Sequence, residues 1–284
     1  MAFPRGIASL EDAFEQGRIH TQRILKLASA TTGARWTDWA FASGQPAYDP
    51  RIGTALAFTP QTDYANEAIY TGHTPGGLST GEKHLVSITL RADGGGGPIN
   101  VVLYDLLGYY PLINGDSSDP QLFDNTQTLP RYTDGAGVLP VLVSSVAPSP
   151  VQGTGLMTYT DALGATRTTA PFAVVTSTTA GQIISGPNTA SPNTAALNVP
   201  LADGSAYGIR SVAGIQYTSP PSGIQALYLI RPITTFTCNG DRYVATERHF
   251  PNYPTLQNGC VLNFFFYQPI AVTTAFFGHL TFAS

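Results

Sequence analysis

Beyond residue 35 the chain is a series of short β-branched and aromatic runs, separated by glycine and proline, with no helical pattern between them. In residues 84–91, Val86, Ile88 and Leu90 alternate with polar residues, which is the two-residue period of a half-buried strand. Many short strands without intervening helices predict a mainly β chain of β-sandwich or jelly-roll type. The other predicted strands are Ile99–Tyr104, Val138–Val146, Leu156–Tyr159, Arg167–Val175, Ala206–Tyr217, Ile224–Arg231 and Val261–Tyr267.

The N-terminal region carries the one helical pattern, over residues 9–30. Ser9 is a suitable N-cap, and Phe14 and Ile24 lie along one apolar stripe that Leu27 widens near its end. We expect this stripe to pack either on its own domain or on a partner, since water would otherwise cover large apolar side chains.

These patterns divide the chain into two parts. We predict an N-terminal helical segment at residues 1–40 and a β-sandwich domain at residues 41–284. A hairpin turn is expected at 160–165, where Asp161 and Gly164 lie between two predicted strands. The Ser-, Thr-, Asn-, Gly- and Pro-rich stretch near 177–205 is expected to be a long surface loop.

Charge is scarce in this chain. Asp, Glu, Lys and Arg make up 11% of its residues, against about 25% in an ordinary soluble domain. A surface this poor in charge is expected to be covered by uncharged polar side chains or by neighbouring protein. The alternative interpretation of this composition is a secreted β domain with an uncharged polar surface. The net charge of -4, without clustered Lys and Arg, argues against direct nucleic-acid binding. The sequence has no run long enough to cross a bilayer and no signal-like N-terminus, so we expect no membrane partner and no export.

No residue pattern predicts catalysis or metal binding, so we expect a non-enzymatic chain without cofactors. Gly77–Gly81 matches the G-x-S-x-G pattern around Ser79, but a loop precedes it and a strand follows, whereas a nucleophile elbow needs a strand before and a helix after. The five histidines are dispersed. Asp116 and Asp119 are expected in an exposed turn rather than a calcium site. Cys238 and Cys260 could form one bridge across a hairpin or remain two buried thiols.

Aromatic residues are dense for a chain with so little charge. Consecutive aromatics at 264–267 place rings on both faces of a strand, and Phe276–Phe277 forms a second group. Both faces must then be covered, either inside a sandwich or by another subunit.

The segment 109–146 resembles a family of tailed-phage virion proteins that are encoded among the head and structural genes. The residues that carry the resemblance are Asp124-Asn125-Thr126, Leu129-Pro130-Arg131-Tyr132-Thr133-Asp134-Gly135, Gly137-Val138 and the hairpin Met157–Gly164. The layout of a helix before Trp36–Pro46 is also similar. The resemblance implies a capsid-associated role of cement or decoration type and brings no enzymatic residues with it. On the residues alone, Pro130 and Asp134-Gly135 define turns around an extended piece in which Arg131 can bind a carboxylate or a carbonyl.

These expectations define a virion protein, assembled in the host cytoplasm, whose partners are the major capsid protein, other virion proteins or itself as a homotrimer. A neck, tail or fibre component is the alternative, and a host-surface carbohydrate-binding module is an alternative of another class. The candidate interface residues are Phe14, Ile24, Leu27, Arg131, Tyr132, Phe265 and Phe277.

Overall fold

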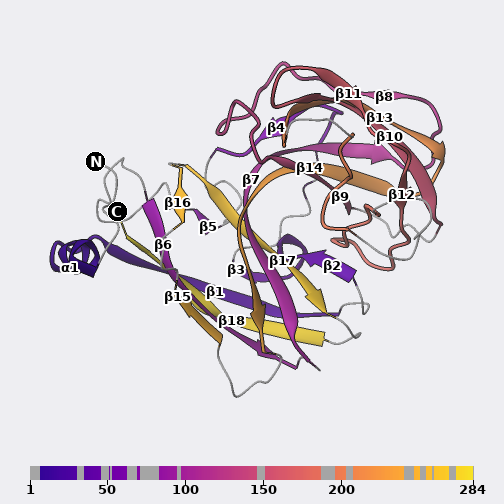
Figure 1. The fold of residues 1–284 in the computed structure, drawn as a ribbon. Coiled ribbons are helices and arrows are strands. Elements are labelled where there is room, and N and C mark those ends of the chain that lie inside the picture. Colours follow the sequence, from indigo (N-terminus) through magenta and orange to yellow (C-terminus); the bar gives the residue numbers. More distant parts are fainter. Residues whose placement is uncertain are drawn as a thin grey trace.

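The structure is a computed structural model in which three antiparallel sheets are joined by two long strands (Figure 1). It describes residues 7–30, 35–45, 51, 53–62, 69–70, 83–94, 97–145, 151–186, 196–202, 207–239, 246–249, 254–257, 259–268 and 273–283.

The central sheet has the strand order β2-β17-β7-β14-β9, with β4 paired to β7 and β5 to β17. Its strands are β2 (Arg35–Asp38), β4 (Thr59–Pro60), β5 (Ile69–Tyr70), β7 (Ile99–Asn114), β9 (Leu139–Ser144), β14 (Ile224–Cys238) and β17 (Val261–Gln268). A short 3-10 helix, η1 (Trp39–Phe41), follows β2.

Two further sheets pack at the two ends of the central sheet. We call the first the terminal sheet, because it contains β1 (Ile19–Ala30) and β18 (Thr273–Ala283) beside β3 (Gly44–Gln45), β6 (Lys83–Asp93), β15 (Thr246–His249) and β16 (Thr255–Leu256). The second, which we call the distal sheet, contains β8 (Gln121–Leu122), β10 (Gly153–Asp161), β11 (Thr166–Thr168), β12 (Phe172–Val174) and β13 (Ile209–Ser219).

The long strands β7 and β14 pair along their length and run from the terminal sheet to the distal sheet (Figure 1). On β7, Val101 and Leu103 belong to the core against the terminal sheet, whereas Leu107 and Tyr110 belong to the core against the distal sheet. Asp105 lies between these two groups of residues. The middle of β7, at Asp105, therefore lies at the boundary between the core against the terminal sheet and the core against the distal sheet. We call this boundary the seam.

The mainly β prediction is confirmed, and every predicted strand overlaps a strand of the structure. The predicted turn at 160–165 is confirmed as well: Thr160 pairs with Thr166, the Gly164 amide donates to the Asp161 carbonyl at 2.9 Å, and Gly164 has a φ of 86°. Such a φ favours glycine, which explains the residue at this position.

The predicted helix over 9–30 is right as far as Glu15 and wrong beyond it. The helix α1 spans Ile7–Glu15, so Ser9 lies inside its first turns rather than at its N-cap. Gly17, at a φ of 67°, follows the helix end, and β1 then pairs with β18 over ten registered residue pairs. Long-range pairing has overridden the local helical period, as tertiary context often does. The division of the chain into a segment 1–40 and a domain 41–284 that folds independently of it remains a prediction.

The prediction of a surface loop near 177–205 is wrong for part of that stretch. Ile183, Ile184 and Val199 are fully buried, and their amides donate at 2.9 Å to the carbonyls of Trp36, Leu142 and Pro140. These segments therefore lie along the edges of the central sheet, at β2 and β9. Residues 187–195 and 203–206 lie outside the described residues.

The two cysteines are both buried and are not joined by a disulfide. Cys238 pairs with Ile99, whereas Leu262 pairs with Asp105, so Cys260 lies near the level of Leu107. The two cysteines are thus about eight strand positions apart along β7, or about 26 Å. A disulfide requires Cα atoms within about 7 Å, so the hairpin bridge does not form in this fold.

Candidate binding surfaces

In the segment that carries the phage resemblance, Asn125 links the central sheet to the distal sheet by hydrogen bonds. The Tyr110 hydroxyl donates to Asn125 Oδ1 at 2.7 Å, and Asn125 Nδ2 donates to the Val212 carbonyl at 2.9 Å. The Asp124 backbone exchanges two bonds of 2.9 Å with Leu56 and Phe58. The side chain of Asn125 and the backbone of Asp124 therefore form hydrogen bonds that stabilise the chain's own fold.

Arg131 forms the seam together with Asp105. Its Nε donates to Asp105 Oδ2 at 2.9 Å and its Nη2 to Oδ1 at 2.7 Å, a bidentate ion pair with 6% and 0% of the two side chains exposed. Arg131 also donates to the carbonyls of Gln61 and Leu106, and the Val261 amide donates to Asp105 Oδ1 at 2.8 Å. The expectation that Arg131 binds a carboxylate and carbonyls is confirmed, but all these groups belong to its own chain.

Burial and hydrogen bonding act on the Asp105 carboxyl in opposite directions. Burial raises the pKa of Asp105, and the bonds from Arg131 and from the Val261 amide oppose that rise. Sequence reasoning did not identify Asp105, although a lone acid inside the apolar run 101–110 is a usable signal for a paired buried charge.

Arg231 closes the seam on its solvent side. It is the β14 partner of Asp105 in the strand register, its guanidinium lies 5.0 Å from the centroid of the Tyr132 ring, and it donates to the Ala136 carbonyl. Gly137, at a φ of 68°, makes this approach possible, because a Cβ there would lie 2.4 Å from Arg231 Nη1. Burial raises the pKa of Tyr132 to about 12, with Arg231 and Arg131 opposing. The residues Thr133, Asp134 and Gln257 complete an open polar depression of about 520 Å³ beside it.

The predicted interface residues lie in different environments. Ile24 and Phe265 are fully buried and Arg131 is nearly so, which leaves these three side chains inside the chain's own core. Phe265 stacks on Tyr104 at a centroid distance of 4.1 Å. Phe264 and Phe266 are buried as well and Tyr267 is partly exposed, so the run is internal as far as Phe266, which is one of the two expectations for residues 264–267.

The remaining predicted interface residues do not form one patch. Phe14 on α1 is 74% exposed and Leu27 is 53% exposed. They are separated by most of β1, so the predicted stripe of Phe14, Ile24 and Leu27 does not exist as one surface. Phe277 is partly exposed under the Arg91 guanidinium, at 5.2 Å, and Tyr132 is partly covered by Arg231. Contact of these residues with a partner stays a prediction.

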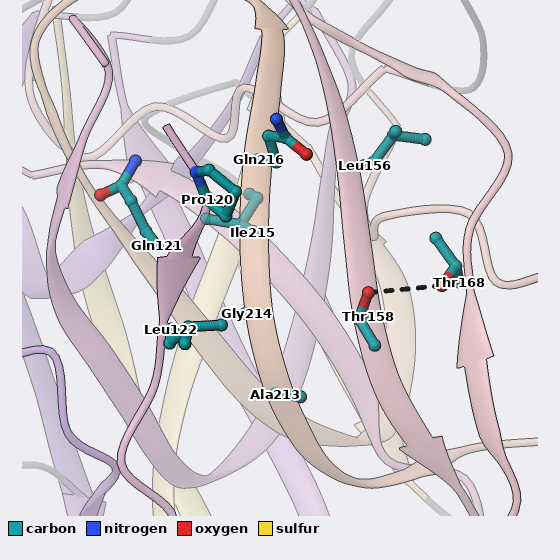
Figure 2. A pocket seen from close by; sticks show the side chains of 10 residues that line it. All are labelled: Pro120, Gln121, Leu122, Leu156, Thr158, Thr168, Ala213, Gly214, Ile215 and Gln216. Atoms are coloured by element: carbon teal, nitrogen blue, oxygen red, sulfur yellow. Dashed lines mark hydrogen bonds between the residues drawn. The ribbon is translucent and has the colours of Figure 1, made fainter. Parts of the chain in front are cut away.

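The outer face of the distal sheet carries a hollow that no charged residue lines. Along β10 the buried residues alternate with the half-exposed Thr154, Leu156, Thr158 and Thr160. The hollow has a volume of about 210 Å³. Figure 2 shows side chains that line it: Leu156 and Thr158 of β10, Thr168 of β11, Ala213 and Gln216 of β13 and Leu122 of β8. The sequence predicted a strand at Leu156–Tyr159 but not which of its side chains would face outward.

Asp38 is a second buried carboxyl, on the opposite face of the central sheet from the seam. Its Oδ1 accepts bonds from the Ala40 amide at 2.9 Å and the Tyr104 hydroxyl at 3.1 Å. Burial raises the pKa of Asp38, while the positive charge of the buried Arg51 and the bonds from Ala40 and Tyr104 oppose the rise.

A raised pKa at Asp38 predicts a defined pH dependence. Its contribution to the free energy of unfolding is full below the ordinary carboxyl pKa of about 4 and is lost as pH rises toward the folded-state pKa. The free energy of unfolding of the wild-type protein should therefore rise relative to that of Asp38→Asn as the pH falls from 7 to about 4. Urea unfolding of both proteins at several pH values measures this difference. A difference that shrinks on acidification would mean that the charge of Arg51 outweighs burial.

The expected turn at 114–119 is exposed, with Asn114 Oδ1 accepting from the Asp116 amide at 2.9 Å and Ser117 Oγ from the Asp119 amide at 3.1 Å. Asn114 and Ser117, rather than the two acids, make the local bonds.

Among the described residues no group of three His, Cys, Asp or Glu side chains could hold a metal ion. Gly77–Gly81, with Ser79, lies outside the described residues. The described part of the chain contains no helix long and apolar enough to span a membrane.

Comparisons with known proteins add little to this geometry. No family model matches the chain, and no curated protein matches it. One similar solved structure is the VP2 subviral particle of infectious bursal disease virus, at 11% identity, covering 93% of this chain and 80% of that chain, with a TM-score of 0.20. Another is infectious bursal disease virus of the Gt strain, at 14% identity, covering 94% and 80%, with a TM-score of 0.18. TM-scores this low do not establish a shared fold.

Proposed function

We propose that the chain is a non-enzymatic structural protein of a tailed-phage virion, which binds the capsid and stabilises it as a cement or decoration protein. The observation that best supports this proposal is the location of the residues that resemble the phage family. Arg131 makes the ion pair of the seam, and Gly135 and Gly137 both have positive φ. A Cβ on Gly135 would lie 2.6 Å from the Ile209 backbone. The resemblance therefore falls on residues that fix the fold, not on an interchangeable loop.

The use of the buried acids also supports a structural role. Asp105 is bonded to Arg131, and Asp161 accepts from the amides of Leu163 and Ala165 at 3.0 and 2.9 Å and from Arg167 Nε at 3.2 Å. These carboxylates hold a seam and a turn. The uncharged outer face of the distal sheet suits contact with protein, because covering it removes no charge from water.

Copy number in purified virions tests the proposal. Quantitative mass spectrometry of gradient-purified particles of the phage that encodes the chain should give a copy number of the same order as that of the major capsid protein. A number typical of a ring or a fibre would place it in the neck, tail or fibre instead, and its absence from particles would contradict the virion role. Fluorophosphonate labelling that is lost in Ser79→Ala would contradict its non-enzymatic character.

A further inference from the structure

We infer that the central sheet carries a binding site for a neutral oligosaccharide, a function that the proposed role in a virion does not require. The site is an open depression of about 460 Å³ beside the ends of β7 and β14 that lie toward the terminal sheet. No charged residue lines this depression. Its lining consists of Trp36, Asn100, Val101, Val102, Leu197, Thr235, Phe236 and Thr237.

The strand register aligns four side chains at this depression. Trp36 of β2 pairs with Tyr267 of β17. Tyr267 in turn pairs with Asn100 of β7, and Asn100 pairs with Thr237 of β14. Residues directly opposite each other on antiparallel strands point to the same face of the sheet, so two aromatic rings, an amide and a hydroxyl form one row across four strands. At about 4.8 Å between neighbouring strands the row is about 14 Å long, which is longer than a single sugar ring.

The aromatic end of the row suits the face of a sugar ring. The rings of Trp36 and Tyr267 are both partly exposed, and their centroids lie 5.4 Å apart at an angle of 50°. A pyranose ring carries C–H groups on its faces and hydroxyls around its edge. An aromatic ring can therefore cover the face of the sugar while the hydroxyls stay directed at polar groups beside it.

The polar end of the row supplies these groups. The Thr237 hydroxyl donates to Asn100 Oδ1 at 2.9 Å, which orients the amide. Among the described residues no group accepts from Asn100 Nδ2, so its two N–H groups can donate to ligand hydroxyls. The exposed Thr235 adds a second hydroxyl to the lining.

The combination of rings and uncharged polar groups selects the class of ligand. A purely apolar partner would bury the Asn100 amide without an acceptor, which is costly. A charged ligand would meet no opposite charge in the lining. A neutral sugar satisfies both the rings and the amide. Because the lining contains no carboxylate, the site has no acid and base with which to cleave a glycosidic bond.

Tryptophan fluorescence of the full chain tests this site, independently of any role in a virion. The chain has two tryptophans, and Trp39 is fully buried, so a ligand that stacks on Trp36 changes the emission of the exposed one. The probes are neutral trisaccharides of glucose, galactose, mannose and N-acetylglucosamine, with a trisaccharide of galacturonic acid and a proline-rich peptide beside them. At least one neutral trisaccharide should change the emission in a saturable way.

Calorimetric titration of three variants with the same trisaccharide locates the site. Trp36→Ala should weaken binding about 10-fold or more, because it removes the stacking ring. Asn100→Ala changes an exposed side chain, so it should keep the fold and weaken binding about 5-fold. Tyr207→Ala is the matched control, since Tyr207 is 78% exposed and does not line the depression, and it should bind like wild type.

Thermal melting of each variant shows whether it is folded, and Asn100→Ala decides the outcome if Trp36→Ala does not fold. Failure of all neutral trisaccharides to bind would overturn the inference. So would tighter binding of the galacturonic acid trisaccharide, binding of the proline-rich peptide alone, or equal weakening by Asn100→Ala and Tyr207→Ala.

Discussion

Replacing Arg131 by Met is expected to lower the free energy of unfolding by about 3–5 kcal/mol, because the substitution leaves the Asp105 carboxylate buried without its cation. Asp105 has no exposed surface, and of the two groups that donate to its carboxylate, Arg131 and the Val261 amide, only the amide remains after the substitution. The carbonyls of Gln61 and Leu106 lose their donor as well. Urea unfolding followed by circular dichroism measures the loss.

Two further variants separate the lost pair from lost packing. Arg131→Met with Asp105→Asn removes the buried charge but keeps an oxygen for the Val261 amide, so it should recover at least about 1 kcal/mol of the loss. Arg91→Met makes the same change at an exposed arginine, which lies over Phe277, and should cost less than about 1 kcal/mol. Equal costs at Arg131 and Arg91 would contradict the role of the seam.

The sequence identifies the strands well but not how deeply each is buried. Residues 84–91 alternate as in a half-buried strand, yet β6 buries every residue from Lys83 to Ile88, whereas β10 buries every second residue. The sequence also assigns Arg131 a carboxylate or carbonyl partner from the turns around it. It does not identify Asp105 as that partner, because a partner 26 positions away is set by how β7 meets the loop and not by local spacing.

The N-terminal region shows why local pattern fails. Residues 19–30 fit a helical stripe, yet Ile24 and Lys26 are buried while Arg23 and Leu27 are exposed, which is the alternation of a strand. Lys26 is fully buried and its Nζ donates to the Ala42 carbonyl at 2.9 Å, which a helix with a solvated lysine face would not predict. The partner that decides between the two periods is β18, at the other end of the chain.

Deleting residues 1–32 should therefore prevent the terminal sheet from folding, rather than detach a helical anchor from an intact domain. The deletion removes β1, which lies between β18 and β3 in that sheet. It also removes Ile24 from the core that contains Trp39, Phe276 and Leu280. Circular dichroism and thermal melting should show loss of the cooperative transition of the wild-type protein.

Deleting only residues 1–17 is the matched control for that loss. It removes α1 and Gly17 and keeps every residue of β1. The packing that disappears is that of Ala13 and Leu10 on Val86 and Ala283, a small cluster that should contribute about 1–3 kcal/mol. The shorter chain should therefore fold with a lower melting temperature. Both shortened chains lack the exposed Phe14 of α1. A defect in assembly that both chains share would therefore result from the loss of the helix. Unfolding that occurs only in the longer deletion would result from the loss of β1. A fully folded chain without residues 1–32 would mean that β18 can end the sheet on its own, with its backbone groups turned to water.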